Sequence, residues 1–248
     1  RGIKNMNSTF LMHCGGRPIG FDDPALSFVP QKTNTYEPVS FGELLLNTKR
    51  VCDDLLDMEF VDQKIAVSAK DQRMFGLLQY RKDEQDQIGH AVGIRSSHDK
   101  SMSIGFCSGA TLFVCDNMAF TGEVTYMRKH TKNVFDDLKE KLVTTIYNSK
   151  DKLFNIEEDA EKLKNIEINN DDAYAFIGKA LGHKTLLARQ AQNAIKHWNN
   201  PPYADFMNKD AWSLYNANTE ALKSTQPNKI IEKHIDLHSR ILDHFGIG

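Results

Sequence analysis

Polar and ionisable side chains crowd into one stretch of the chain, residues 93–132, between short apolar runs typical of β-strands. The side chains that could do chemistry there are Arg95, Ser96, Ser97, His98, Asp99, Lys100, Asp116, Asn117, Glu123, Arg128, Lys129, His130 and Lys132. Cations can contact phosphates, and a histidine beside an aspartate can move protons. Because functional residues concentrate on loops that a rigid scaffold positions, we expect this stretch to hold the site.

The first interpretation is a strip that binds single-stranded nucleic acid. Cations would contact the phosphates, while His98 and Tyr126 would lie near the bases. The predicted contact residues are Arg95, His98, Lys100, Tyr126, Arg128, Lys129, His130 and Lys132. Cations at the start of a helix oppose its macrodipole, so the cluster at residues 128–132 costs stability and is a candidate for function. This interpretation requires Arg95 and Arg128 to converge on one groove.

A second interpretation of the same stretch is a hydrolase, with or without a metal ion. Its candidate residues are His98 as the general base, with Asp99, Asp116 and Glu123 around it. Asn117, next to Asp116, belongs to the same possible site. Adjacent residues of an extended strand point to opposite faces, however, so Asp99 is poorly placed to orient His98. The alternative is an Asx-type turn, in which Ser96, Ser97 and Asp99 hydrogen-bond the backbone between two strands.

Motifs for metals and cofactors are missing from the sequence. His234 and His238 are one helical turn apart, but Ile235 follows His234 where a metalloprotease helix has its glutamate. The four cysteines lack zinc-like spacing, and neither a dinucleotide-binding nor a P-loop glycine motif occurs. We therefore expect no metal and no cofactor, and packing roles for the two histidines.

The elements that must position these residues divide the chain in two. Residues 40–43 form a capping box before a helix of about eighteen residues. Five alternating runs follow within residues 58–115, with a turn expected at Ser108-Gly109-Ala110, whereas residues 131–248 carry only helical patterns. We predict an α+β fold with an antiparallel or mixed sheet and one packed helix in residues 1–130. An all-helical half in residues 131–248 would pack on it as one unit.

Composition restricts the function further. The chain has 248 residues and a net charge of −2, so nucleic acid could bind only through a local basic patch. No run of eighteen apolar residues occurs, and we expect a cytoplasmic protein without membrane contact. Acidic tracts at residues 83–86 and 157–161 suit a third interpretation, a protein-interaction factor.

Several segments resemble a known family. They are LMHCGGRPI near the start, FGLLQYR at 75–81, GIRSSHDKSMSIGF, VCDNMAFTGEV, RKHT and WSLYNANTEALK at 212–223. Together they resemble an uncharacterised family of phage, prophage and plasmid proteins that carry a domain of unknown function. One departure is Ser96, where the family pattern has asparagine.

The resemblance implies a mobile-element origin and a bacterial cytoplasmic setting. It also implies an α+β core that binds single-stranded DNA as a homo-oligomer in recombination or replication. A host or phage protein is the alternative partner, and in that case the chain would inhibit a host defence or a host enzyme. The resemblance implies no catalytic residues.

Overall fold

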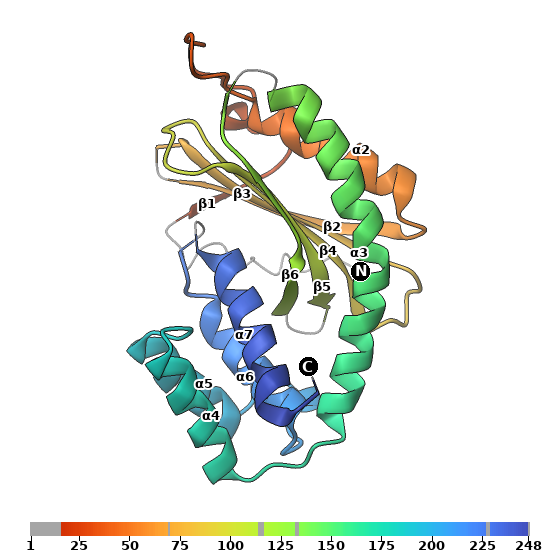
Figure 1. Cartoon of the computed structure of the whole chain (residues 1–248), viewed down its shortest axis with the longest axis vertical. Coiled ribbons are helices and arrows are strands. Elements are labelled where there is room, and N and C mark those ends of the chain that lie inside the picture. The colour runs from red at the N-terminus through yellow and green to blue at the C-terminus, as the bar shows by residue number, and fades with distance from the viewer. Residues whose placement is uncertain (1–15, 69, 114–116, 132–133, 227–228, 248) are drawn as a thin grey trace, which may run out of the picture.

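A computed structural model describes residues 16–247 except 69, 114–116, 132–133 and 227–228. Six strands form one sheet in the order of the sequence, and every neighbouring pair is antiparallel (Figure 1). The strands are β1 (Gly16–Ile19), β2 (Glu59–Ser68), β3 (Arg73–Arg81), β4 (Ile88–Ser97), β5 (Ile104–Leu112) and β6 (Asn117–Arg128). Alternating side chains give this sheet two different faces.

Two helices cover one face of the sheet, α2 (Phe41–Leu55) and α3 (Val134–Lys164) (Figure 1). Ser40 begins α2, because its hydroxyl accepts a hydrogen bond from the Glu43 N–H at 3.3 Å. Leu45 of α2 and Ile146 of α3 are fully buried in one core with Ile94 and Phe106 of the sheet. Burial of this apolar face is what holds the two helices on the strands.

Four further helices form a bundle beside the other face: α4 (Asn170–Gly182), α5 (Ala188–Asn199), α6 (Ala211–Leu222) and α7 (Ile230–Phe245). Side-chain caps begin two of them, Asn169 at α4 and Asp210 at α6. Helix α6 is buried on nearly all sides, so it forms the centre of the bundle. Ile230 of α7 packs on the sheet against Phe75 and Cys107.

The predicted α+β class is confirmed, and one detail of the prediction is wrong. Residues 108–110 continue strand β5 rather than turning the chain. All three pair with β4, and Gly109 and Ala110 also pair with β6 after a register shift that follows Cys107. The arm before residue 40 contains a short strand, β1, and a 3₁₀ turn at Pro24–Leu26. Two cysteines, Cys52 and Cys107, are buried free thiols, whereas Cys14 and Cys115 lie outside the described residues. Within the described residues, no helix is long and apolar enough to cross a bilayer.

Candidate functional site

Three segments meet at one end of the sheet. The turn at residues 98–103 joins β4 to β5, residues 129–131 follow β6, and residues 33–37 of the N-terminal arm cross both. The backbone N–H of Glu37 donates to the carbonyl of His130 at 3.1 Å. The Tyr36 hydroxyl donates to the carbonyl of His98 at 3.2 Å. The arm therefore fixes the two strand-end segments to each other.

Between these segments lies an open pocket of about 320 Å³, here called the loop-end hollow. Its walls combine two lysines with hydroxyl-bearing side chains: Thr35, Tyr36, Lys100, Ser101, Met102, Ser103, Lys129, His130 and Thr131. The Lys100 Nζ lies 4.5 Å from the centre of the Tyr36 ring, in a cation–π contact. Ammonium groups and hydroxyls are the side chains that bind phosphate oxygens.

The carboxylates nearest this hollow are bound to other cations. Glu37 pairs with Lys32 at 2.6 Å, and Asp99 pairs with Arg73 at 2.8 Å. Lys100 and Lys129 are both exposed, and neither forms an ion pair with a carboxylate of the described residues. The hollow therefore keeps positive charge although the chain as a whole is slightly acidic.

Lys100 also has an unusual backbone. Its φ of 62° is left-handed, a region that favours glycine and costs other residues about 1 kcal/mol. Turn geometry by itself would therefore favour glycine here, so a lysine at this position is consistent with a role for its side chain.

Two neutral histidines form the wall behind the hollow. His98 is 4% exposed and stacks on Phe41 of α2, with ring centres 3.8 Å apart. Its Nε2 lies 3.0 Å from the Val39 carbonyl, to which it donates. Burial lowers the pKa of His98, and burial together with the nearby His98 lowers the pKa of His130 to about 4. At neutral pH both rings therefore pack as uncharged groups, and His98 faces α2 rather than the hollow.

The His98–Asp99 pair has the geometry of a turn and not of a proton relay. Asp99 accepts from the Ser101 N–H at 3.0 Å, which is the expected Asx turn. Burial would raise the pKa of Asp99, but hydrogen bonds from Ser101 and the contact with Arg73 hold it at about 2. Asp99 is thus a carboxylate that positions the turn.

Arg95 and Arg128 do not converge on one groove, so the prediction that they share a site is wrong. Register pairs Arg95 with Gly105, which in turn pairs with Met127, whereas Arg128 pairs with Ile104. Neighbouring residues of a strand face opposite ways, so the two arginines lie on opposite faces of the sheet.

Both arginines are bound to carboxylates. Arg95 is 6% exposed and pairs with Glu232 of α7 at 2.9 Å, with Met127 Sδ also 2.9 Å away. Arg128 pairs with Asp137 of α3 at 2.5 Å.

The structure places the other predicted residues unevenly. Lys100, Lys129 and His130 line the hollow together. Tyr126 is half-buried, and its ring stacks with that of Phe106 at 6.5 Å. Lys132 and Asp116 lie outside the described residues, and the side chains of Asn117 and Glu123 are not described. No group of three metal-ligating side chains occurs among the residues described.

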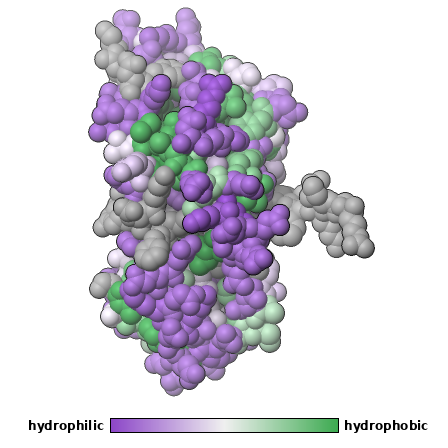
Figure 2. Space-filling model, turned by 90° about the vertical axis from the view of Figure 1, so that its right-hand side faces the viewer, coloured by the Kyte–Doolittle hydropathy of each residue, from purple (hydrophilic) through white to green (hydrophobic). Residues whose placement is uncertain are grey.

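The sequence analysis missed a larger hollow, the α2–α3 groove, of about 830 Å³. Its floor is apolar and its rim is charged, with the lining residues Val39, Leu44, Asn47, Arg50, Val51, Asp54, Phe106, Leu138, Lys139, Glu140, Leu142, Val143 and Thr144. Figure 2 shows the apolar surface exposed between hydrophilic rims on this side of the molecule. The sequence signal for this groove is Val143, an apolar residue of α3 that lies outside the buried stripe of the helix.

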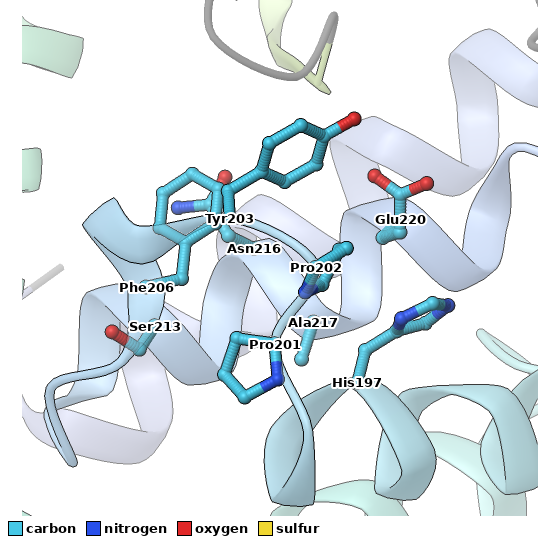
Figure 3. A pocket seen from close by; sticks show the side chains of 9 residues that line it. All are labelled: His197, Pro201, Pro202, Tyr203, Phe206, Ser213, Asn216, Ala217 and Glu220. Atoms are coloured by element: carbon cyan, nitrogen blue, oxygen red, sulfur yellow. The ribbon is translucent and has the colours of Figure 1, made fainter.

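A third hollow in the helical half is too small for a ligand. In Figure 3 the side chains of Tyr203 and Phe206 face those of His197 and Glu220 across it. Its volume of about 10 Å³ holds roughly one water molecule. The buried Ser213 hydroxyl on its wall, which has no hydrogen-bond partner among the described residues, would suit such a water.

Comparison with known proteins identifies a family whose description names no activity. The family model described as Domain of unknown function (DUF932) matches residues 32–242. No curated protein and no solved structure matches the chain. The matched range includes every described residue that lines the loop-end hollow.

Proposed function

The chain belongs to the family described as Domain of unknown function (DUF932), which names no activity. We propose that it binds single-stranded nucleic acid at a smaller site than the predicted strip, because Arg95 and Arg128 lie on opposite faces of the sheet and take no part in it. The loop-end hollow would hold backbone phosphates. One observation carries this proposal: Lys100 and Lys129 come from two different loops and line one hollow, while the acids beside it pair with other cations.

The details of the hollow suit contacts with the phosphate backbone of a strand. Tyr36 is buried under Lys100, so the hollow offers charge and hydroxyls rather than an exposed ring for base stacking. Phosphate contacts of this kind position a strand without reading its sequence. Single strands are exposed during recombination and replication. The proposed role is therefore in one of these processes of a mobile genetic element, in the cytoplasm of a bacterium.

Fluorescence anisotropy with a labelled oligothymidylate of about 20 nucleotides tests the proposal. In 50 mM salt the wild-type chain binds. The double variant Lys100→Ala, Lys129→Ala binds about tenfold more weakly, because two phosphate contacts are lost. The slope of log K against log salt becomes shallower by about 1.4, since each single-strand phosphate contact contributes about 0.7.

The matched control is Lys82→Ala, Lys141→Ala, which removes two exposed lysines elsewhere on the protein. It keeps the wild-type affinity and salt slope. Equal losses in the two double variants would show a diffuse charge effect and reject the hollow as the site. Absence of binding by the wild-type chain in 50 mM salt would reject the function itself, because phosphate contacts are strongest at low salt.

A further inference from the structure

The outer side of the helix pair α4 and α5 is apolar, although it faces solvent. The Tyr174 hydroxyl of α4 donates to Asn199 at the end of α5 at 3.1 Å, so the two helices are antiparallel neighbours. Leu181 follows Tyr174 by two turns and therefore lies on the same side of α4. Ile195 precedes Asn199 by one turn of α5 in the same way. We call this surface the hairpin face, formed by the exposed residues Tyr174, Gly178, Leu181, Leu187 and Ile195.

A glycine in the middle of the hairpin face has no packing reason within the described chain. Gly178 lies inside α4, one turn after Tyr174, where glycine destabilises a helix relative to alanine. A Cβ added at Gly178 would meet no other atom within 4 Å, so its neighbours do not require the missing side chain. A partner whose backbone comes close to α4 would require it.

The charges around the hairpin face have one sign. Residues 173–204 contain four Lys or Arg residues and no Asp or Glu. All four are exposed, and none forms an ion pair with a carboxylate of the residues described; they are Lys179, Lys184, Arg189 and Lys196. The α2–α3 groove, which two cations and two acids line, has no such preference. The hairpin face therefore favours an acidic partner.

The glycine and the aliphatic side chains decide which acidic partner fits. Anionic lipid or the phosphates of a nucleic acid would pair with the cations, but neither needs a helix without a side chain at Gly178. A helix packed on α4 and α5 does, because the side chains at the contact set how closely two helix axes approach. An apolar stripe on that helix would cover Leu181, Leu187 and Ile195, which are 40%, 62% and 37% exposed.

We propose that the hairpin face binds an acidic amphipathic helix of another protein. The apolar stripe of this helix packs along the line where α4 and α5 meet, its backbone crosses Gly178, and its flanking carboxylates reach Lys179 and Lys196. The proposal does not depend on nucleic-acid binding. Residues of the loop-end hollow come just before α3 in sequence and α4 follows it, and the 31 residues of α3 span about 45 Å between them (Figure 1).

Fluorescence anisotropy with a synthetic helix tests the proposal. The probe is a labelled peptide of about 18 residues of leucine, alanine and glutamate, with the leucines along one side and the glutamates beside them. The wild-type chain binds it with a Kd below about 100 μM. Gly178→Gln binds it about tenfold more weakly, because the new side chain lies in the path of the helix. The same variant melts about 2–3 °C higher, since glutamine is the better helix former.

Control variants separate this steric effect from changes in the fold and in charge. Gly178→Ala also raises the melting temperature but adds only a methyl group, so its affinity stays within about threefold of the wild type. Lys179→Gln, Lys196→Gln weakens binding about tenfold and makes it less dependent on salt. Lys82→Gln, Lys141→Gln, at two exposed positions elsewhere, leaves both unchanged.

Four results would overturn the proposal. Equal binding of a peptide of the same composition in scrambled order, in which the leucines form no stripe, would show attraction between charges alone. A lower melting temperature of Gly178→Gln would show that the fold itself requires the glycine. Binding of phosphatidylglycerol vesicles in place of the peptide, or no binding at all, would exclude an acidic helix as the partner. Self-association of the wild type that Gly178→Gln abolishes would assign the face to a second copy of the chain.

Discussion

The loop-end hollow and the Arg95–Glu232 ion pair use cations from the same short stretch of sequence in opposite ways. Lys129 is exposed and has no acid partner among the described residues, whereas Arg95 is 6% exposed and bound to Glu232. Glu232 is 137 residues away in sequence and arrives on the last helix. The comparison shows what decides the role of a cation in this stretch. If folding brings a remote acid to it, the cation stabilises the fold; otherwise it can bind a ligand.

Replacement of Arg95 by alanine should give the largest effect and the sharpest contrast with the hollow. The change removes a nearly buried ion pair and leaves a space beside Gly105, so the free energy of unfolding should fall by about 2–3 kcal/mol. Lys129→Ala should change it by less than about 0.5 kcal/mol, because that side chain is exposed. Urea denaturation of both variants measures the two values.

Glu232→Gln is the control for charge, because it keeps the size of the side chain and removes its negative charge. It should cost about 1 kcal/mol, less than loss of the arginine, since the Glu232 side chain is 49% exposed. Equal stability of Arg95→Ala and Lys129→Ala would contradict the distinction between the two regions.

Much of this distinction was out of reach of the sequence. The alternating runs correctly predicted a sheet, and Ser40 correctly predicted the start of α2. Which face Arg128 occupies depends on the register of β6, and a shift of one residue reverses every side chain of a strand. The sequence predicts a turn at residues 108–110, but these residues lie inside β5. A register of β6 inferred from that turn is therefore incorrect. The acids that bind Arg95 and Arg128 come from helices, and local pattern contains no information about such partners.

The second largest effect is expected from acid, which should lower the free energy of unfolding through the two histidines at the hollow. His130 has a pKa of about 4 in the folded chain and an ordinary value near 6.5 when unfolded, and burial lowers the pKa of His98 in the same direction. Between those values the unfolded chain binds more protons, so stability is full above about pH 6.5 and falls as the pH drops toward 4. We expect the free energy of unfolding to be about 1–2 kcal/mol lower at pH 4.5 than at pH 7, after allowance for partial exposure to solvent.

The His130→Asn variant isolates this contribution. Asparagine does not titrate, so the difference in stability between the variant and the wild type should shrink as the pH falls from 7 to 4.5. A difference that stays constant over this range would show that His130 titrates normally in the folded protein.

Gly105→Ala should lower the free energy of unfolding by a smaller amount, through the Arg95–Glu232 ion pair. A Cβ at this position would lie 3.2 Å from both Cγ and Nε of Arg95, closer than a comfortable contact. Because Arg95 is held by Glu232, it can move only by straining that ion pair, and we expect a loss of about 1 kcal/mol. In the Arg95→Ala background the same substitution should cost little, and a double-mutant cycle measures this coupling.

The smallest effect separates stability from function within the hollow. Lys100 has a φ of 62°, so Lys100→Ala keeps the strained backbone and loses the contact with Tyr36. Lys100→Gly loses the same contact but relieves the strain, and this gain exceeds the entropic cost of glycine by a fraction of a kcal/mol. Lys100→Gly should therefore be about 0.5–1 kcal/mol more stable than Lys100→Ala, the reverse of the usual order, while both bind the oligothymidylate equally weakly. If the glycine variant instead bound like the wild type, the ammonium group would not be the ligand, and the comparison would lose its functional half.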